Sequence, residues 1–217
     1  MLEEKTLKKS TSSPEVNNSL KIYSETQIGR AMGRVYNFLG ISMEYPEGEI
    51  FQPSYFPCLY QMLEDLNFAG QRENLKNAIE GSPNFIEDIR SEYTRLFINS
   101  FPRVPAPPYE SCYGSCRNML NDTAAQEVDS FYRNCGYSIN RCVELPDHIS
   151  YEMEFTGALL EDGKYEEAED FLNTHLRKWV PLFREKVLNH AMHPFYKAIV
   201  DLIDFFIKTG EMRRYYG

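Results

Sequence analysis

The chain has 217 residues, of which 42% are hydrophobic, 14% aromatic and 25% charged. This composition excludes disordered, collagen-like and low-complexity proteins, and a chain of this length can fold without a disulfide or a metal ion to stabilise it. The formal net charge is -9, with 32 Asp and Glu against 23 Lys and Arg. An acidic balance argues against general nucleic-acid binding, which needs clustered Lys and Arg, and is compatible with a basic partner peptide.

The sequence favours a cytoplasmic location. Its five cysteines are an odd number without a regular framework, which is typical of reduced thiols. Residues 1–21 are polar and without apolar periodicity, so we expect a flexible lead and no signal peptide there. The apolar stretch at residues 198–207 is interrupted by Asp201 and Asp204 and is too short to cross a bilayer, so no stable membrane insertion is expected.

Apolar residues at spacings of three and four predict helices in the first half of the chain. The first is expected to begin at Ser24, which forms a capping box with Gln27, and to end before Pro46. Ser82 and Pro83 are expected to begin the strongest helix of this half, as a cap followed by proline at the first helical position. Helices are predicted within residues 53–68, 73–80 and 82–97.

The middle of the chain is rich in proline. Residues 101–109 hold four prolines in nine residues and cannot be the interior of a helix. Two interpretations are open: a stiff linker between two helical halves, or a rigid surface that captures a peptide. Tyr109, Glu110, Ser111 and Tyr113, at the end of this stretch, are the candidate binding residues.

Helical patterning resumes in the second half. Helices are predicted at residues 123–135, 146–162, 165–179, 182–188 and 195–206, with a break at Pro181. No repeat and no alternating strand is found, so the predicted class is all-α, a multi-helix bundle with a long proline-rich connection in the middle. We expect one domain over residues 22–217, with a division into two halves near residues 100–120 as an alternative.

The sequence has no standard catalytic motif, which disfavours an enzyme. A metal-binding protein or metalloenzyme remains an alternative, because Cys112, Cys116, Cys135 and Cys142 lie close together in sequence and His148 follows them. Their spacing lacks the CxxC pattern that places two thiolates in one turn, and cysteine is commonly buried without a ligand role. No metal is therefore assigned.

His148 and Glu152 are one helical turn apart, and Asp147 precedes them. These groups could form an acid–base or metal site. The structural interpretation is that Asp147 caps the helix and that Glu152 is a solvated first-turn acid favoured by the helix dipole.

Three segments together resemble a known family. They are EYTRLF (Glu92–Phe97), PPYESCY (Pro107–Tyr113) and PDHISYEMEF (Pro146–Phe155). In order and separation they are similar to the TorD/DmsD/NarJ family of redox-enzyme maturation chaperones, closest to the TorD-like branch, and the resemblance covers about residues 28–207. Tyr93 and Tyr109 stand where some members carry tryptophan.

The resemblance implies an all-helical cytoplasmic chaperone with no catalytic centre and no cofactor. It would bind the twin-arginine signal peptide of the catalytic subunit of a molybdopterin-cofactor oxidoreductase, and assist maturation and cofactor insertion before export. The peptide-binding residues that the resemblance implies are Tyr93, Leu96, Phe97, Pro108, Tyr109, Ser111, Glu144, Asp147 and His148.

The residue chemistry independently suits such a partner. A twin-arginine leader has a cationic start and an apolar segment, and a complementary receptor would be an apolar aromatic groove rimmed by carboxylates. The residues that can supply the groove are Tyr93, Leu96, Phe97 and Tyr109, and those that can supply the rim are Glu110, Glu144 and Asp147. A structural adaptor for a folded redox-enzyme subunit remains a further alternative, and both a monomer and a domain-swapped dimer are compatible with the sequence.

Overall fold

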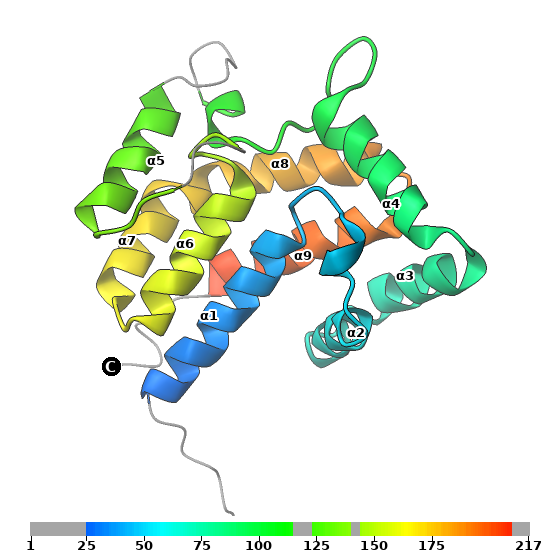
Figure 1. The fold of residues 1–217 in the computed structure, drawn as a ribbon, viewed down its shortest axis with the longest axis horizontal. Helices are drawn as coiled ribbons and strands as arrows, with labels where there is room; N and C mark the ends of the chain where they lie inside the picture. The colour runs from blue at the N-terminus through cyan, green and yellow to red at the C-terminus, as the bar shows by residue number, and fades with distance from the viewer. Residues whose placement is uncertain (1–24, 115–122, 140–143, 210–217) are drawn as a thin grey trace, which may run out of the picture.

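The computed structural model describes residues 25–114, 123–139 and 144–209 (Figure 1). The predictions for residues 1–21, Ser24, Cys116 and Cys142 lie outside these residues. The predicted all-α class is confirmed: within the described ranges the chain forms helices and turns and no strand. The helices are α1 (Glu25–Ile41), α2 (Tyr55–Asp65), α3 (Ala69–Gly81), α4 (Phe85–Tyr93), α5 (Thr123–Asn134), α6 (Ile149–Glu161), α7 (Tyr165–Thr174), α8 (Leu176–His190) and α9 (Pro194–Thr209).

Three short turns complete the described elements. They are a 3-10 turn η1 (Gly48–Ile50), a π-helical turn η2 (Thr94–Ile98) that continues α4, and a 3-10 turn η3 (Glu110–Cys112). In the view of Figure 1, α5, α6 and α7 lie on the left and α2, α3 and α4 on the right, while α8 and α9 extend across both groups. No described helix is both long and apolar enough to span a membrane.

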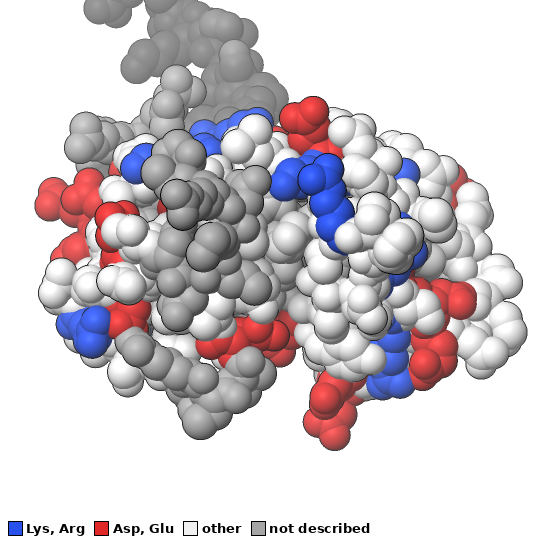
Figure 2. All heavy atoms as spheres, turned by 90° about the horizontal axis from the view of Figure 1, so that it is seen from above, with Lys and Arg blue, Asp and Glu red and all other residues white. Residues whose placement is uncertain are grey.

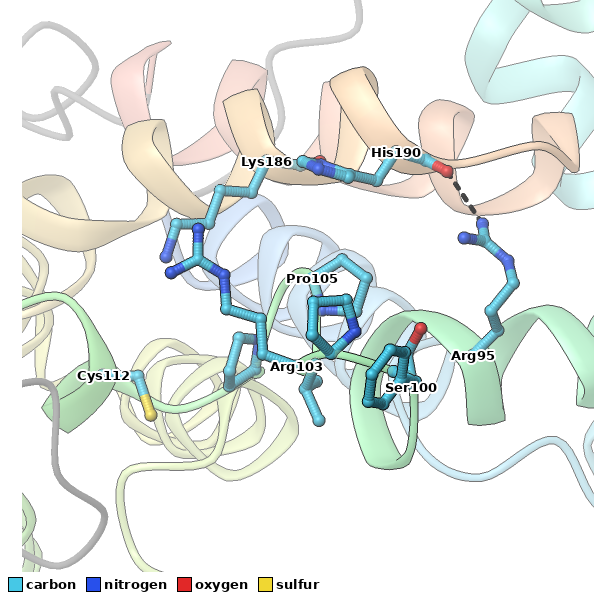
Figure 3. A pocket seen from close by; sticks show the side chains of 11 residues that line it. Arg95, Ser100, Arg103, Pro105, Cys112, Lys186 and His190 are labelled. Carbon is cyan, nitrogen blue, oxygen red and sulfur yellow. Dashed lines mark hydrogen bonds between the residues drawn. The ribbon is translucent and has the colours of Figure 1, made fainter.

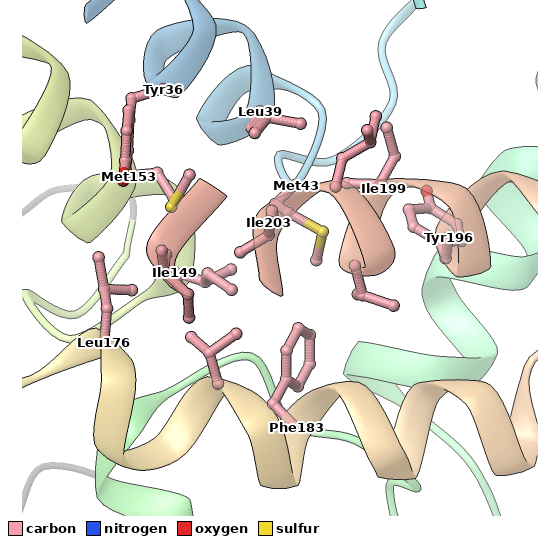
Figure 4. Close-up of a cluster of buried hydrophobic side chains, with 14 of the residues drawn as sticks. Tyr36, Leu39, Met43, Ile149, Met153, Leu176, Phe183, Tyr196, Ile199 and Ile203 are labelled. Carbon is pink, nitrogen blue, oxygen red and sulfur yellow. The ribbon is translucent and has the colours of Figure 1, made fainter. Parts of the chain in front are cut away.

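One hydrophobic core joins the two groups of helices. Buried side chains of α1, α6, α8 and α9 point into it, among them Tyr36, Met153, Phe183 and Ile203 (Figure 4). The central contributor is α9, which packs against α1, α3 and α8. The core therefore contains residues from both sides of the proline-rich stretch.

The most extensive helix contact joins α1 and α6. Glycines allow the two backbones to approach closely there. A Cβ atom at Gly33 would lie 2.7 Å from the Gly157 carbonyl oxygen, and one at Gly157 would lie 2.8 Å from the Gly33 oxygen. Both distances are shorter than real Cβ contacts, so this crossing requires glycine on both helices.

Predicted boundaries are wrong at three helices, the first of which is α3, which begins at Ala69 and not at residue 73. The break predicted at Pro181 falls instead at His175, whose φ of -120° and ψ of -87° end α7, and α8 continues through Pro181. Proline removes one backbone hydrogen bond, but the apolar face that Trp179 and Phe183 bury in the core keeps the helix continuous. The helix predicted from Ser82 begins at Phe85.

Candidate functional site

The second and third sequence motifs meet in an isolated antiparallel bridge between Tyr109 and His148. The Glu110 N–H donates to the Asp147 carbonyl oxygen at 3.0 Å, and the Ser111 N–H donates to the Asp147 carboxylate at 2.9 Å. Asp147 is fully buried, so its carboxylate holds the two segments together from within. This junction fixes where the flanking side chains lie.

Tyr109 joins this junction to Glu144. Its phenol donates a hydrogen bond of 2.5 Å to the Glu144 carboxylate, and its ring contacts the His148 ring edge-on, with centroids 5.0 Å apart. Burial, and then the hydrogen bond and charge of Glu144, raise the pKa of Tyr109. The phenol therefore stays protonated and orients Glu144.

His148 is a buried neutral imidazole whose two ring nitrogens differ in their hydrogen bonding. Its side chain is 1% exposed, and burial lowers its pKa to about 3. Nδ1 accepts the Ser150 N–H at 3.2 Å, so Nε2 carries the proton and is a donor. Among the described residues Nε2 has no hydrogen-bond partner. His148, and not Asp147 as predicted, is thus the N-cap of α6.

A cavity of about 810 Å³ lies beside this junction. It is formed by the end of α1 and the segment after it, by α4, and by the start of α6. Its carboxylates are Glu44, Glu47, Glu49, Glu144 and Glu154. Its apolar and aromatic lining residues are Ile41, Tyr45, Ile50, Tyr93 and Tyr151. No Lys or Arg of the described residues lines it, so the cavity is acidic with an apolar wall.

Three of the sequence-predicted residues line this acidic cavity, namely Tyr93, Glu144 and His148. They come from three distant segments of the chain. Tyr93 is only 3% exposed, and its hydroxyl donates to the Met43 carbonyl oxygen at 3.2 Å. Tyr109 does not line the cavity itself, but it contacts two residues that do, Glu144 and His148.

The other predicted residues lie elsewhere. Leu96 and Phe97 are in the hydrophobic core, where the Phe97 ring contacts the Tyr196 ring at 5.0 Å. The apolar stripe of the YxxLF segment therefore faces the core, as such stripes on surface helices do. Pro108, Ser111 and Asp147 are buried in the junction and do not line the cavity.

Several lining residues were not predicted. The segment MEYPEGEI, which follows α1, contributes Glu44, Tyr45, Glu47 and Glu49 to the lining. The sequence pattern predicts only the end of the first helix there. Three acids and a tyrosine within eight residues of a loop are a recognisable signal, because binding residues often lie on loops held by rigid helices. Glu154 lies in the third motif, but its proximity to Glu44 required the tertiary structure.

Glu154 and Glu44 form a carboxyl pair in the cavity. Burial raises the pKa of Glu154 to about 7, and the hydrogen bond and negative charge of Glu44 add to that effect. Gly40 makes room for the pair, because a Cβ atom there would lie 3.1 Å from Glu154 Cγ. Glu154 therefore keeps its proton to a higher pH than an ordinary carboxyl group does.

Glu152 is a further acid, which lies near the junction of the Tyr109 and His148 segments. Glu152 is fully buried, and its carboxyl group accepts the Trp179 indole N–H at 3.0 Å. Burial, followed by the charge of Glu110, raises the pKa of Glu152 well above its ordinary value. Glu110 in turn contacts His175 Nδ1 at 2.8 Å. The interpretation of Glu152 as a solvated first-turn acid is therefore wrong, because its side chain is fully buried in the core.

A larger cavity, of about 840 Å³, lies between η2, the 99–107 segment and α8 (Figure 3). Its charged lining residues are basic: Arg95, Arg103 and Lys186, with His190 beside them. Arg95 is held by Glu92 at 2.9 Å and by the His190 carbonyl oxygen at 2.8 Å. Figure 2, a view from above the molecule of Figure 1, shows Lys and Arg side chains together with Asp, Glu and uncharged residues on that face. A cationic peptide would be repelled here, so the acidic cavity is the candidate site.

The described residues do not assemble a metal site. Cys112 lies in η3 and Cys135 follows α5, while the other two cysteines of the predicted cluster are outside the described ranges. Within those ranges no group of three or more His, Cys, Asp or Glu side chains is arranged to hold a metal ion.

Comparisons with known proteins place the chain in a family. The family model described as nitrate reductase delta subunit matches residues 63–185, more than half of the chain. The chaperone protein TorD of Vibrio parahaemolyticus is 28% identical over 161 residues, which cover 64% of this chain and 74% of the relative. The Tat proofreading chaperone DmsD of Salmonella typhi is 29% identical over 117 residues, which cover 54% of this chain and 57% of the relative.

A solved structure has the same fold. A redox enzyme maturation protein from Archaeoglobus fulgidus superposes with a TM-score of 0.58 at 22% identity, covering 87% of this chain and 99% of the other. At this identity the likeness concerns the fold alone. With the family model and the sequence relatives, it agrees with the resemblance of the three motifs. The chain belongs to the nitrate reductase delta subunit family, the TorD/DmsD/NarJ family of redox-enzyme maturation chaperones.

Proposed function

We propose that this protein is a cytoplasmic chaperone that binds the twin-arginine signal peptide of the catalytic subunit of a molybdopterin-cofactor oxidoreductase. It assists maturation and cofactor insertion before export and catalyses no reaction itself. The observation that carries the proposal is the acidic cavity, with five carboxylates and no Lys or Arg of the described residues in its lining.

The cavity matches both parts of such a leader. Its carboxylates attract the cationic start of the peptide, which speeds association and sets orientation more than it adds affinity. Its apolar wall suits the apolar segment, and Tyr45, at 45% exposure, and Ile41, at 39% exposure, are accessible to it. Buried aromatic and aliphatic contacts supply most of the binding energy in interfaces of this kind.

His148 lines the cavity and carries a buried donor that a leader would reach once the lining opens. Its Nε2–H is buried without a partner among the described residues, and the low pKa keeps the imidazole neutral at physiological pH. A neutral donor can bond a carbonyl oxygen of the leader without repelling its arginines. A buried donor that lacks a partner costs free energy, and a bound peptide would remove that cost.

The proposal is tested by the affinity for labelled twin-arginine leaders of molybdopterin oxidoreductases, measured by fluorescence anisotropy. Changing Tyr45 or Tyr151 to alanine is expected to raise Kd about 10- to 30-fold, because each removes an aromatic anchor of the cavity. Phe101→Ala is the matched control: Phe101 is 98% exposed and lines the basic cavity, so its loss should leave Kd unchanged.

Two results would contradict the proposal. One is that the wild-type protein binds no leader of the panel. The other is that Phe101→Ala weakens binding as much as Tyr45→Ala does. Binding of a client subunit that lacks its leader, with the same affinity as the full precursor, would instead favour the adaptor alternative.

A further inference from the structure

The basic cavity between η2, the 99–107 segment and α8 is not used by the proposed leader site. It has a volume of about 840 Å³, and its cationic lining residues are Arg95, Arg103 and Lys186 (Figure 3). No Asp or Glu of the described residues lines it. Such a concentration of positive charge is unexpected in a chain whose formal net charge is -9, and it favours an anionic partner at this place.

Arg95 is held in position at one end of the basic cavity. Its guanidinium donates to the Glu92 carboxylate at 2.9 Å and to the His190 carbonyl oxygen at 2.8 Å. Glu92 is 6% exposed and does not line the cavity. This pairing fixes the Arg95 side chain between η2 and the end of α8, so the two elements form one wall of the cavity.

The other two cations of the basic cavity have no carboxylate partner. Neither Arg103 nor Lys186 forms a salt bridge with a described residue. Lys186 is positioned by the Tyr113 ring, whose centroid lies 4.3 Å from its Nζ, and this contact leaves the positive charge in place. Figure 3 shows Arg103 and Lys186 extending toward the same side of the cavity. Like charges that share a space repel each other, and a bound anion would remove that repulsion.

Exposed apolar side chains accompany these cations. Phe101 lines the basic cavity and is 98% exposed. Three further exposed apolar residues lie on the segments that form the cavity, namely Ile98 in η2, Leu182 in α8 and Met192 after α8. Leu182 is one helical turn before Lys186 and therefore on the same face of α8. A group of large apolar side chains left in water is typical of a surface that a protein partner covers.

The 99–107 segment is stiff before any partner arrives. Pro102, Pro105 and Pro107 line the basic cavity, and each proline restricts its own backbone. The Ala106 N–H donates to the Leu96 carbonyl oxygen at 3.1 Å, which ties the segment to η2. A surface that is already ordered loses little conformational entropy when it binds.

We propose that the basic cavity binds an acidic protein segment that carries apolar side chains. Carboxylates of the segment bond Arg103 and Lys186, and an apolar side chain packs against Phe101. A small anion would pair with the cations but leave the apolar side chains in water. Nucleic acid is disfavoured, because three cations on an acidic protein supply few of the phosphate contacts that it needs. The inference goes beyond the proposed function, which assigns the leader to the acidic cavity.

Selection from a library of random peptides displayed on phage tests the proposal on the full chain. The wild type should enrich peptides in which Asp or Glu alternate with apolar residues. The double variant Arg103→Gln, Lys186→Gln should not enrich them, because it lacks both unpaired cations. Lys178→Gln is the matched control: it removes an exposed lysine of α8 that lines neither cavity, so the enrichment should persist.

Fluorescence anisotropy with the most enriched acidic peptide measures the size of the effect. The double variant should raise Kd about 3- to 30-fold, and added salt should weaken wild-type binding. Phe101→Ala should raise the Kd of this peptide about 5- to 30-fold, although it leaves the Kd of the leader unchanged. Circular dichroism of each variant checks that the fold is retained.

Three results would overturn the inference. One is that the wild type enriches no acidic peptide, and another is that the double variant binds the acidic peptide as tightly as the wild type does. The third is that the peptide binds equally well after its apolar residues are changed to serine, which would show a site for anions only. A wild type that binds the acidic peptide but no twin-arginine leader would overturn the proposed function and support this inference.

Discussion

Glu152 is a buried carboxylic acid whose surroundings favour its protonated form over its ionised form. The group is fully buried, and its acceptor oxygen is used by the Trp179 indole. The negative charge of Glu110 acts in the same direction as burial and raises the pKa of Glu152 further. A neutral hydrogen-bonded acid is therefore part of the core, and an ionised one would destabilise it.

Glu152→Gln should leave the free energy of unfolding at neutral pH nearly unchanged, because the amide has a similar volume and its oxygen can still accept the Trp179 indole N–H. Glu152→Ala should lower it by about 2–4 kcal/mol, since it opens a cavity and leaves the indole N–H without a partner. Urea denaturation followed by circular dichroism measures both. Equal stability of the alanine and glutamine variants would contradict this role.

The pH dependence of stability gives a second measurement on the same variant. The pKa of Glu152 is higher in the folded state than its ordinary value of 4.5, so the folded chain binds more protons than the unfolded chain above that pH. This group's contribution to stability is full below about pH 4.5 and is lost as the pH rises toward the folded pKa. The free energy of unfolding of Glu152→Gln should therefore fall less than that of the wild type as the pH rises above about 4.5, because the amide does not titrate.

At the scale of elements, the contact between α1 and α6 decides the shape of the acidic cavity. The glycines of the crossing bring the end of α1 against the start of α6, which places Glu44 beside Glu154. A helix pair at an ordinary separation would move these two acids apart.

Gly157→Ala should lower the free energy of unfolding by about 2 kcal/mol, because its Cβ would collide with the Gly33 carbonyl oxygen and with Asn37. Gly70→Ala is the control: it lies in α3 with no atom within 4 Å of the added Cβ, and should stabilise by about 0.5–1 kcal/mol. Thermal unfolding measures both, and a neutral or stabilising Gly157→Ala would contradict the close crossing.

The break predicted at Pro181 illustrates how tertiary contacts outweigh local preference. A proline within a helix costs about 3 kcal/mol in isolation. In α8 the residues on either side of it, Trp179 and Phe183, are buried in the same core, and their burial offsets that cost. Local periodicity could show both apolar stripes but not that they are one helix.

At the scale of the molecule, the single core predicts cooperative unfolding. Trp179, the only tryptophan, is buried in α8 and reports on the second half of the chain, while far-UV circular dichroism reports on all helices. Because α9 joins α1 and α3 to α8, the two signals should give the same midpoint in urea. Distinct midpoints would favour two halves divided near residues 100–120.

The molecule has two cavities of opposite charge at different places on the fold. The acidic cavity lies at the junction of α1, α4 and α6, and the basic one lies between the 99–107 segment and α8. Tyr93 lines the first and Arg95 lines the second, so α4 and the η2 turn separate them. If the proposed function is correct, a cationic leader is attracted by the first cavity and repelled by the second.

Apolar spacing alone was enough to predict the helical class and most helix positions, because helix formation and burial leave a periodic pattern along the chain. The three motifs also indicated which segments meet. The bridge between Tyr109 and His148, the burial of Leu96 and Phe97, and the proximity of Glu44 to Glu154 arise from contacts between distant segments. Such contacts depend on how the helices pack, and a one-dimensional pattern carries no record of distance or of which carboxylates are removed from water.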